Sequence, residues 1–150
     1  MDRNKRKIKL NHLLSLHLIQ DLYNIDQTQN TITFGARVSI TELRHFLKTR
    51  LPELATYLDI FASPQIKNIA TVIGNIANAS PIGDMPPALL ALNASIHMIS
   101  KAGKRVIPLH DYFLDYKKTA LQKNEIITHV SFELPQKDFF KTFKNSNRKD

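Results

Sequence analysis

The sequence FASPQIKNIATVIGNIANASPIGD, from Phe61 to Asp84, is long, apolar and rich in small residues. It has no clean helical period, so we expect a long irregular loop here. Such a segment must satisfy its backbone N–H and C=O groups, and small residues such as Gly74 and Gly83 let the backbone approach a partner closely. The segment is therefore either a buried connection stitched to a neighbouring strand or a loop that binds a ligand. Composition alone favours the buried connection, although polar side chains for a ligand are present at Thr71, Asn75, Asn78 and Asp84.

Helices are predicted on both sides of this segment. Ser39 is followed three residues later by Glu42, which is the reciprocal capping pattern of a helix start. Pro52 is a suitable first residue for a second helix. Pro86 and its neighbour lead into a short, buried helix over residues 88–92. The apolar positions at helical spacing in the first two helices are Leu43, Phe46, Leu47, Leu54, Tyr57, Leu58 and Phe61.

Strands account for most of the remaining chain. The alternating segment Asn30–Val38 predicts a strand with Ile32 and Phe34 on one face, whereas Ile8–Ile25 is read as a strand or a short helix. The segments 95–100 and 105–109 predict a hairpin, and 111–123 predicts a loop with aromatic anchors. A long strand over 126–134 and a further candidate over 139–144 follow, with one apolar face formed by Ile126, Val130, Phe132 and Leu134. The fold class is therefore α+β, an antiparallel sheet with flanking helices.

Length and composition fit one soluble domain. The chain has 150 residues, 43% hydrophobic and 23% charged, which is enough to bury a core and argues against disorder. It has no cysteine, so it cannot by itself hold an iron–sulfur cluster or a disulfide. Without a membrane-spanning run or a secretory signal, we expect a cytoplasmic protein with no membrane span.

The net charge of +8 gathers at the two ends. We expect residues 1–9 to form a basic N-terminal tail ahead of a domain over residues 10–150. Such charge is typical of an anionic partner, and a nucleic-acid-binding domain is the least favoured hypothesis, because the N-terminal cluster has no aromatic side chains for base stacking. We therefore predict no nucleic-acid partner.

Motifs of other enzyme classes are missing. The six histidines include no pair at helical metal-site spacing, so we predict no metal site; His97 and His129 lie opposite the predicted apolar stripe and are expected to be exposed. The chain also lacks a serine nucleophile elbow and a dinucleotide-binding glycine motif.

The ordered motifs ASPQIKN, TVIGNI and ASPIGDMPPALLAL resemble the FAD-binding domain of molybdenum hydroxylases, the xanthine dehydrogenase and carbon monoxide dehydrogenase flavoprotein family. The segments 32–36, 106–109 and 121–127 and Lys144 extend the resemblance, which covers roughly residues 8–150. It implies the second lobe of a vanillyl-alcohol-oxidase-like FAD-binding fold. The cofactor-binding residues implied by the resemblance are Phe61, Thr71, Val72, Ile73, Gly74, Asn75, Asp84, Ile127 and Lys144.

Each of these residues has an implied role. Residues 71–75 would touch the flavin and its phosphate-ribityl arm, and Asp84 would bind a polar group of the cofactor. Phe61 and Ile127 would lie against a flat ring of the nucleotide, and Lys144 would bring positive charge to the anionic cofactor. Taken singly, Phe61 and Ile127 are better explained as core, and Lys144 as part of a solvated basic face. No catalytic acid or base is predicted, because the cofactor supplies the redox chemistry.

Two departures from the family pattern bear on function. Ile73 stands where the family has a glycine, and at a position with positive φ a β-branched side chain would cost roughly 1–3 kcal/mol or block the site. The family also has a preceding lobe with a pyrophosphate loop and a following domain, so the sequence is expected to be an N- and C-terminally truncated fragment. The implied function is a flavoprotein component of an oxidoreductase. It would pass electrons from iron–sulfur and molybdopterin domains or subunits to NAD or oxygen. The alternative is a homologue without FAD binding that acts as a scaffold or interaction domain.

Overall fold

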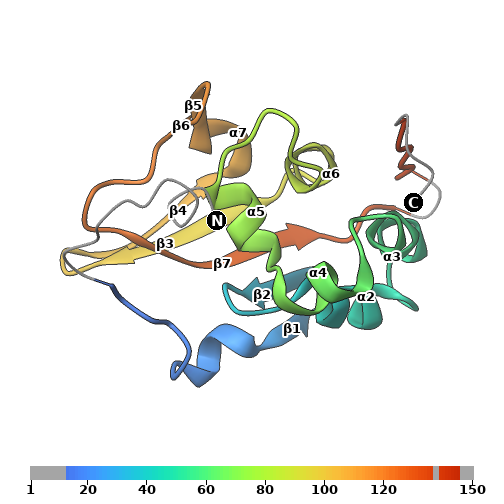
Figure 1. Ribbon diagram of the computed structural model, residues 1–150, viewed down its shortest axis with the longest axis horizontal. Helices are drawn as coiled ribbons and strands as arrows, with labels where there is room; N and C mark the ends of the chain where they lie inside the picture. Colours follow the sequence, from blue (N-terminus) through green and yellow to red (C-terminus); the bar gives the residue numbers. More distant parts are fainter. Residues whose placement is uncertain (1–12, 137–138, 146–150) are drawn as a thin grey trace.

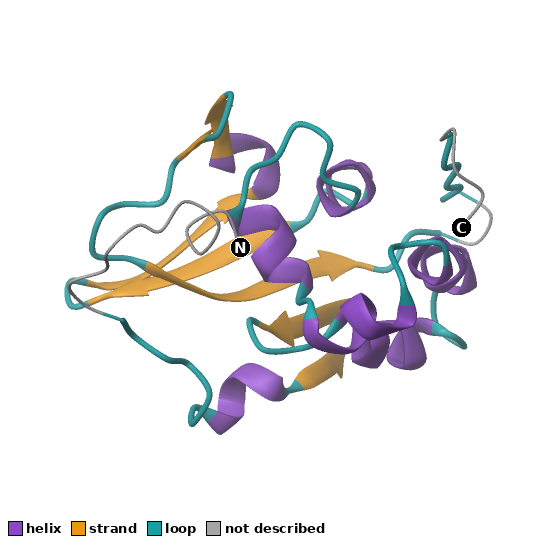
Figure 2. Cartoon of the chain, viewed as in Figure 1, coloured by secondary structure: helices purple, strands orange, loops and turns teal. Residues whose placement is uncertain are grey.

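The computed structural model describes residues 13–136 and 139–145 and contains one five-stranded antiparallel sheet with helices packed against it (Figures 1 and 2). The strand order is β1-β2-β7-β3-β4, and a separate two-stranded sheet pairs β5 with β6. The predicted α+β class is confirmed. The strands are β1 Ile25–Thr28, β2 Thr31–Gly35, β3 Ser95–Ser100, β4 Gly103–Pro108, β5 Phe113–Asp115, β6 Lys118–Thr119 and β7 Ile126–Glu133. The helices are η1 Gln20–Tyr23, α2 Ile40–Leu47, α3 Pro52–Asp59, α4 Pro64–Ile69, α5 Val72–Ala77, α6 Met85–Ala91 and α7 Leu109–Tyr112.

Local signals place the helices before and after the central segment correctly. The Ser39 hydroxyl accepts from the Glu42 N–H at 3.2 Å, and the Glu42 carboxylate accepts from the Ser39 N–H at 2.7 Å. This reciprocal cap satisfies donors that the first helical turn would otherwise leave free. Pro52 begins α3, as predicted. The short helix predicted over residues 88–92 is present as α6, which begins at Met85 and so contains both prolines in its first turn.

The prediction of a long irregular loop between Phe61 and Asp84 was wrong in part. Residues 64–69 form α4 and residues 72–77 form α5, each six residues long. A helix of fewer than two turns shows too little of the 3.6-residue period to be recognised from apolar spacing. Figure 1 shows α5 in front of the sheet, where it contacts β7.

Strand β7 departs from the predicted alternation. The β3–β7 register shifts between His97 and Met98, so that His97 pairs with His129 and Met98 with Ile127. The two strands no longer match residue for residue, and this irregularity changes which side chains face the core. Ile127 is therefore buried and Ile126 is only half-buried, which corrects the predicted apolar face. The face that does pack against the helices includes Ile32, Phe34, Ile96, Met98, Ile127, Val130 and Phe132.

Three further predictions differ from the structure. The expected loop over 111–123 contains the end of α7 and the β5–β6 hairpin. Residues 139–144 form no strand; Phe140 packs into the core while Phe139 and Phe143 are exposed. The N-terminal segment is neither one strand nor one helix, since its described part contains η1 and the first residue of β1. The predicted basic tail over residues 1–9 lies outside the described residues.

No helix in the described part of the chain combines the length and apolarity needed to cross a membrane.

Candidate functional site

The first turn of α5 is organised by Thr71 and Gly74. The Thr71 hydroxyl accepts from the Gly74 N–H at 3.0 Å, and the Thr71 carbonyl accepts from the Asn75 N–H at 3.1 Å. A Cβ atom at Gly74 would lie 2.9 Å from the Thr71 hydroxyl oxygen, so a larger residue here would have to displace that side chain. The Gly74 and Asn75 amides therefore donate within the chain.

The connection before α5 forms backbone hydrogen bonds with the start of α2, as expected for a buried connection. The Ala70 carbonyl accepts from the Ile40 N–H at 2.9 Å, and Ser39 and Thr71 form an isolated antiparallel bridge. These contacts hold the start of α5 against the start of α2. The Ala70 and Thr71 carbonyls and the Gly74 and Asn75 amides thus have partners within the chain, while Gly74 and Ala77 on α5 are exposed.

A largely apolar cleft lies beside this side of α5. Its volume is about 640 Å³, and its walls come from the segment before η1, the β2–α2 connection, α5 and the turn before β7. Among the residues expected to bind a cofactor, Thr71, Ile73, Gly74 and Ile127 line it. The other lining residues are Leu13, Leu14, Ser15, Leu16, Ala36, Arg37, Ala77, Leu121, Glu125 and Ile126.

Ile73 fits its position without backbone strain. It lies inside α5 with a negative φ, and its side chain is 5% exposed. The cost expected for a β-branched residue at positive φ does not arise here. Ile73 and Ile127, which is 6% exposed, belong to the buried core and at the same time form part of the cleft wall.

The remaining predicted residues on α5 and before α4 are structural. Val72 is fully buried and Phe61 is 7% exposed, both within the hydrophobic core. The Asn75 side-chain oxygen accepts from the Met85 N–H at 3.3 Å and so ties α5 to the start of α6.

Asp84 and Lys144 engage each other. The Lys144 ammonium lies 3.2 Å from the Asp84 carboxylate and also donates to the Ile60 carbonyl at 3.1 Å. The Asp84 carbonyl accepts from the Tyr57 hydroxyl at 2.8 Å. Burial, and secondarily the Asp84 charge, raises the pKa of Tyr57. Neither Asp84 nor Lys144 lines the cleft, so the structure divides the predicted residues between two places.

Sequence reasoning missed several cleft residues. Arg37 comes from the β2–α2 connection and Ala77 from α5, and Leu121 and Glu125 come from the turn before β7. Glu125 is held by Arg105, whose Nε and Nη2 donate to the two carboxylate oxygens at 2.9 and 2.7 Å. These hydrogen bonds, followed by the one from the Gln122 N–H, lower the pKa of Glu125. Leu121 and Glu125 lie in the segment 121–127 that extends the family resemblance, but no role was predicted for them. Arg37 and Ala77 lie in none of the matched segments and join the cleft only in the folded chain.

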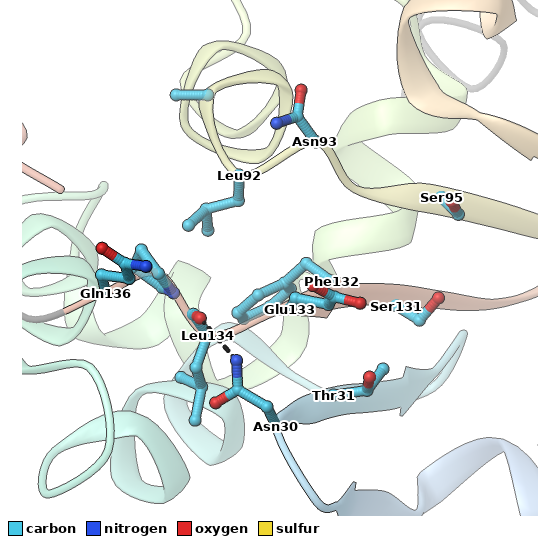
Figure 3. A pocket seen from close by; sticks show the side chains of 12 residues that line it. Asn30, Thr31, Leu92, Asn93, Ser95, Ser131, Phe132, Glu133, Leu134 and Gln136 are labelled. Atoms are coloured by element: carbon cyan, nitrogen blue, oxygen red, sulfur yellow. Dashed lines mark hydrogen bonds between the residues drawn. The ribbon is translucent and has the colours of Figure 1, made fainter. Parts of the chain in front are cut away.

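A second hollow of about 560 Å³ lies at the end of β2, β7 and β3 (Figure 3). Its lining is polar, with Asn30, Asn93, Ser95 and Glu133 around it, and the Asn30 amide donates to the Leu134 carbonyl at 2.8 Å. None of the predicted cofactor-binding residues lines it. It is also smaller than the cleft beside α5, so neither its volume nor its lining favours it as the cofactor site.

The two strand histidines differ from expectation. His97 and His129 are half-buried rather than exposed, with ring centroids 6.3 Å apart. His97 also shares a 2.8 Å hydrogen bond with the Ser131 hydroxyl. Burial, and secondarily the neighbouring His129, lowers the pKa of His97. Within residues 13–136 and 139–145, no three metal-ligating side chains come together.

A family model described as the FAD binding domain in molybdopterin dehydrogenase matches residues 1–137. The chain belongs to this family. It is 33% identical to the xanthine dehydrogenase/oxidase of Gallus gallus over 147 residues, which cover 88% of this chain and 11% of the relative. It is 32% identical to aldehyde oxidase 1 of Bos taurus, covering 91% of this chain and 11% of the relative.

Solved structures of the family carry the same fold. A Cu,Mo-containing CO dehydrogenase in a cyanide-inactivated form superposes with a TM-score of 0.82 at 29% identity, over 87% of this chain and 46% of that chain. A reconstituted CO dehydrogenase from Oligotropha carboxidovorans gives 0.73 at 29% identity, over 77% and 41%. This chain thus spans about a tenth of the curated relatives' length and less than half of the solved chains.

Proposed function

We propose that this chain forms one wall of the FAD site in a molybdenum hydroxylase, and that the cleft beside α5 holds part of the cofactor. The family membership supports FAD as the ligand. The cleft itself carries the proposal, because its walls are mostly apolar and a glycine at its edge leaves room for close approach. Apolar walls with few polar groups suit a flat aromatic ring.

The residues fit the ring of a flavin better than its diphosphate. Ile73 and Ile127 provide buried aliphatic surface at the cleft wall, where a planar ring can pack. The Gly74 and Asn75 amides are engaged within α5 and are not free donors for phosphate. We infer that the diphosphate takes most of its contacts elsewhere, with Asp84 and Lys144 reaching the cofactor only if their ion pair opens.

When bound, FAD would accept electrons that arrive through iron–sulfur clusters from a molybdopterin site and deliver them to NAD or oxygen. The share of this chain is to position the flavin and shield it from water. The iron–sulfur and molybdopterin parts would belong to other domains or subunits. The cytoplasmic location, the domain boundary at residue 10 and the absence of a nucleic-acid partner remain predictions.

A scaffold without FAD is the second candidate. The observation that favours it is the internal use of groups expected to face the cofactor, namely the Gly74 amide and the Asp84–Lys144 pair. In that case the cleft would exist in the fold but hold no flavin.

The two candidates are separated by filling the cleft. Ala77 is exposed and lines the cleft, so Ala77→Phe should block it without disturbing the core. We expect the purified chain to bind FAD, seen as quenching of flavin fluorescence and a raised melting temperature, and Ala77→Phe to abolish both effects. Ala102→Phe makes the same change at the exposed tip of the β3–β4 hairpin and should leave binding intact. The proposal would be contradicted if the wild-type chain did not bind FAD, or if Ala77→Phe bound FAD with the affinity of the wild type.

A further inference from the structure

Arg37 is a positively charged side chain at an otherwise apolar wall of the cleft. It lies two residues after the end of β2, and its N–H donates to the Leu22 carbonyl at 2.8 Å, which fixes the backbone there. Its guanidinium Nε donates to the Tyr23 hydroxyl at 3.3 Å, and its Nη2 lies 2.5 Å from His17 Nδ1. The guanidinium carbon also lies 5.5 Å from the centre of the Tyr23 ring. The side chain is therefore held in place by the His17 ring and by the hydroxyl and ring of Tyr23.

The positive charge of Arg37 is not neutralised by a carboxylate within the described residues. The other charged side chain of the cleft, Glu125, is paired with Arg105 in a two-point contact. The remaining lining residues are uncharged. The cleft thus combines mostly aliphatic walls with Arg37, whose guanidinium contacts Tyr23 and His17 and no carboxylate among the described residues. This arrangement suits an aromatic ligand that carries negative charge.

We propose that Arg37 is the anion-binding group of this cleft and recognises the negatively charged part of the bound cofactor. This inference rests on the proposed function, since FAD has such groups in its diphosphate and in its reduced ring. The guanidinium directs two of its N–H groups to Tyr23 and His17. Its other N–H groups can donate to phosphate or carboxylate oxygens. Apolar surroundings strengthen such a contact relative to water.

The source of the negative charge is tested with three flavins. Riboflavin has no phosphate, whereas FMN has one and FAD has two. We expect Arg37→Gln to weaken FAD binding by about tenfold or more, in line with a charge-assisted hydrogen bond. Arg37→Lys should lose less, because it keeps the charge but not the fork. Lys101→Gln removes the same charge from the exposed hairpin turn and should leave the affinity unchanged.

The pattern across ligands assigns the partner. Losses for FMN and FAD but not for riboflavin would place the contact on phosphate, whereas losses that appear only with reduced flavins would place it on the anionic ring. Either pattern supports the proposal. Equal affinity of wild type and Arg37→Gln for every flavin would overturn it, with melting curves of the free proteins recorded to establish that each variant is folded.

A test independent of flavin uses two naphthalene dyes of similar shape. Anilinonaphthalene sulfonate is an anion, and N-phenyl-1-naphthylamine is neutral. We expect Arg37→Gln to weaken the anionic dye severalfold and to leave the neutral dye unchanged, while Ala77→Phe weakens both. If Arg37→Gln affects the two dyes alike, the cleft does not recognise charge through Arg37. This result stands whether or not the chain binds FAD, so failure of the proposed function and failure of this inference are distinguished.

Discussion

At the scale of single residues, the first turn of α5 combines a capping contact with a buried anchor. Thr71 and Gly74 close the turn through one hydrogen bond, and Ile73 fills the core beneath it. A Cβ atom at Gly74 would crowd the Thr71 hydroxyl, whereas Ile73 needs no special backbone conformation. Replacing Ile73 to regain the glycine of the family pattern would therefore remove packing rather than relieve strain.

Ile73→Gly is expected to destabilise the protein. The change deletes a buried side chain and adds backbone freedom to a helix, which together should lower the free energy of unfolding by roughly 3–5 kcal/mol. Ile69→Gly makes the same substitution at an 80% exposed residue that ends α4, and should cost no more than about 1 kcal/mol. Urea unfolding of both variants measures the difference. Equal costs would mean that Ile73 contributes no packing.

At the scale of elements, sequence reasoning succeeded where the signal is local. The capping pair Ser39 and Glu42, Pro52 at the start of α3 and the β3–β4 hairpin each depend on neighbouring residues, and all are present. The missed features depend on partners far along the chain. The register shift that buries Ile127 arises between β3 and β7, and α5 is too short to show its period.

The turn before β7 is held by the Arg105–Glu125 pair. Glu125 accepts from the Gln122 N–H at 2.8 Å while Arg105 also donates to the Ala120 carbonyl at 2.9 Å. We expect Glu125→Gln to speed amide hydrogen exchange at Gln122 by about tenfold, because the amide loses a charged acceptor. Glu133→Gln, at the exposed end of β7, serves as the control. Unchanged exchange at Gln122 would mean that the turn is held by other contacts.

At the scale of the whole molecule, the cleft is assembled from segments that are distant in sequence. Its walls are residues 13–16, the connection around Arg37, α5 and the turn before β7, which lie together in the folded chain. The sequence could therefore identify Thr71, Gly74 and Ile127 through family resemblance. It could not identify Arg37 or Ala77 as cleft residues, because they belong to no motif and line the cleft only in the folded chain.

The same sheet gives the molecule a predictable response to acid. The folded-state pKa of His97 lies below its ordinary value, because burial and His129 disfavour the charged form. The unfolded chain then binds more protons, so the stability is fully present above about pH 6.5 and falls as the pH drops through the lowered pKa of the folded state. The lowered pKa of Glu125 also makes the stability fall with decreasing pH, at lower pH values. The ion pair with Arg105 persists until the Glu125 carboxylate is protonated. We expect His97→Gln to flatten the decline in unfolding free energy below about pH 6.5. His110→Gln changes a largely exposed histidine and should leave the profile as in wild type. A His97→Gln profile parallel to wild type would show that the decline comes from groups outside this histidine pair.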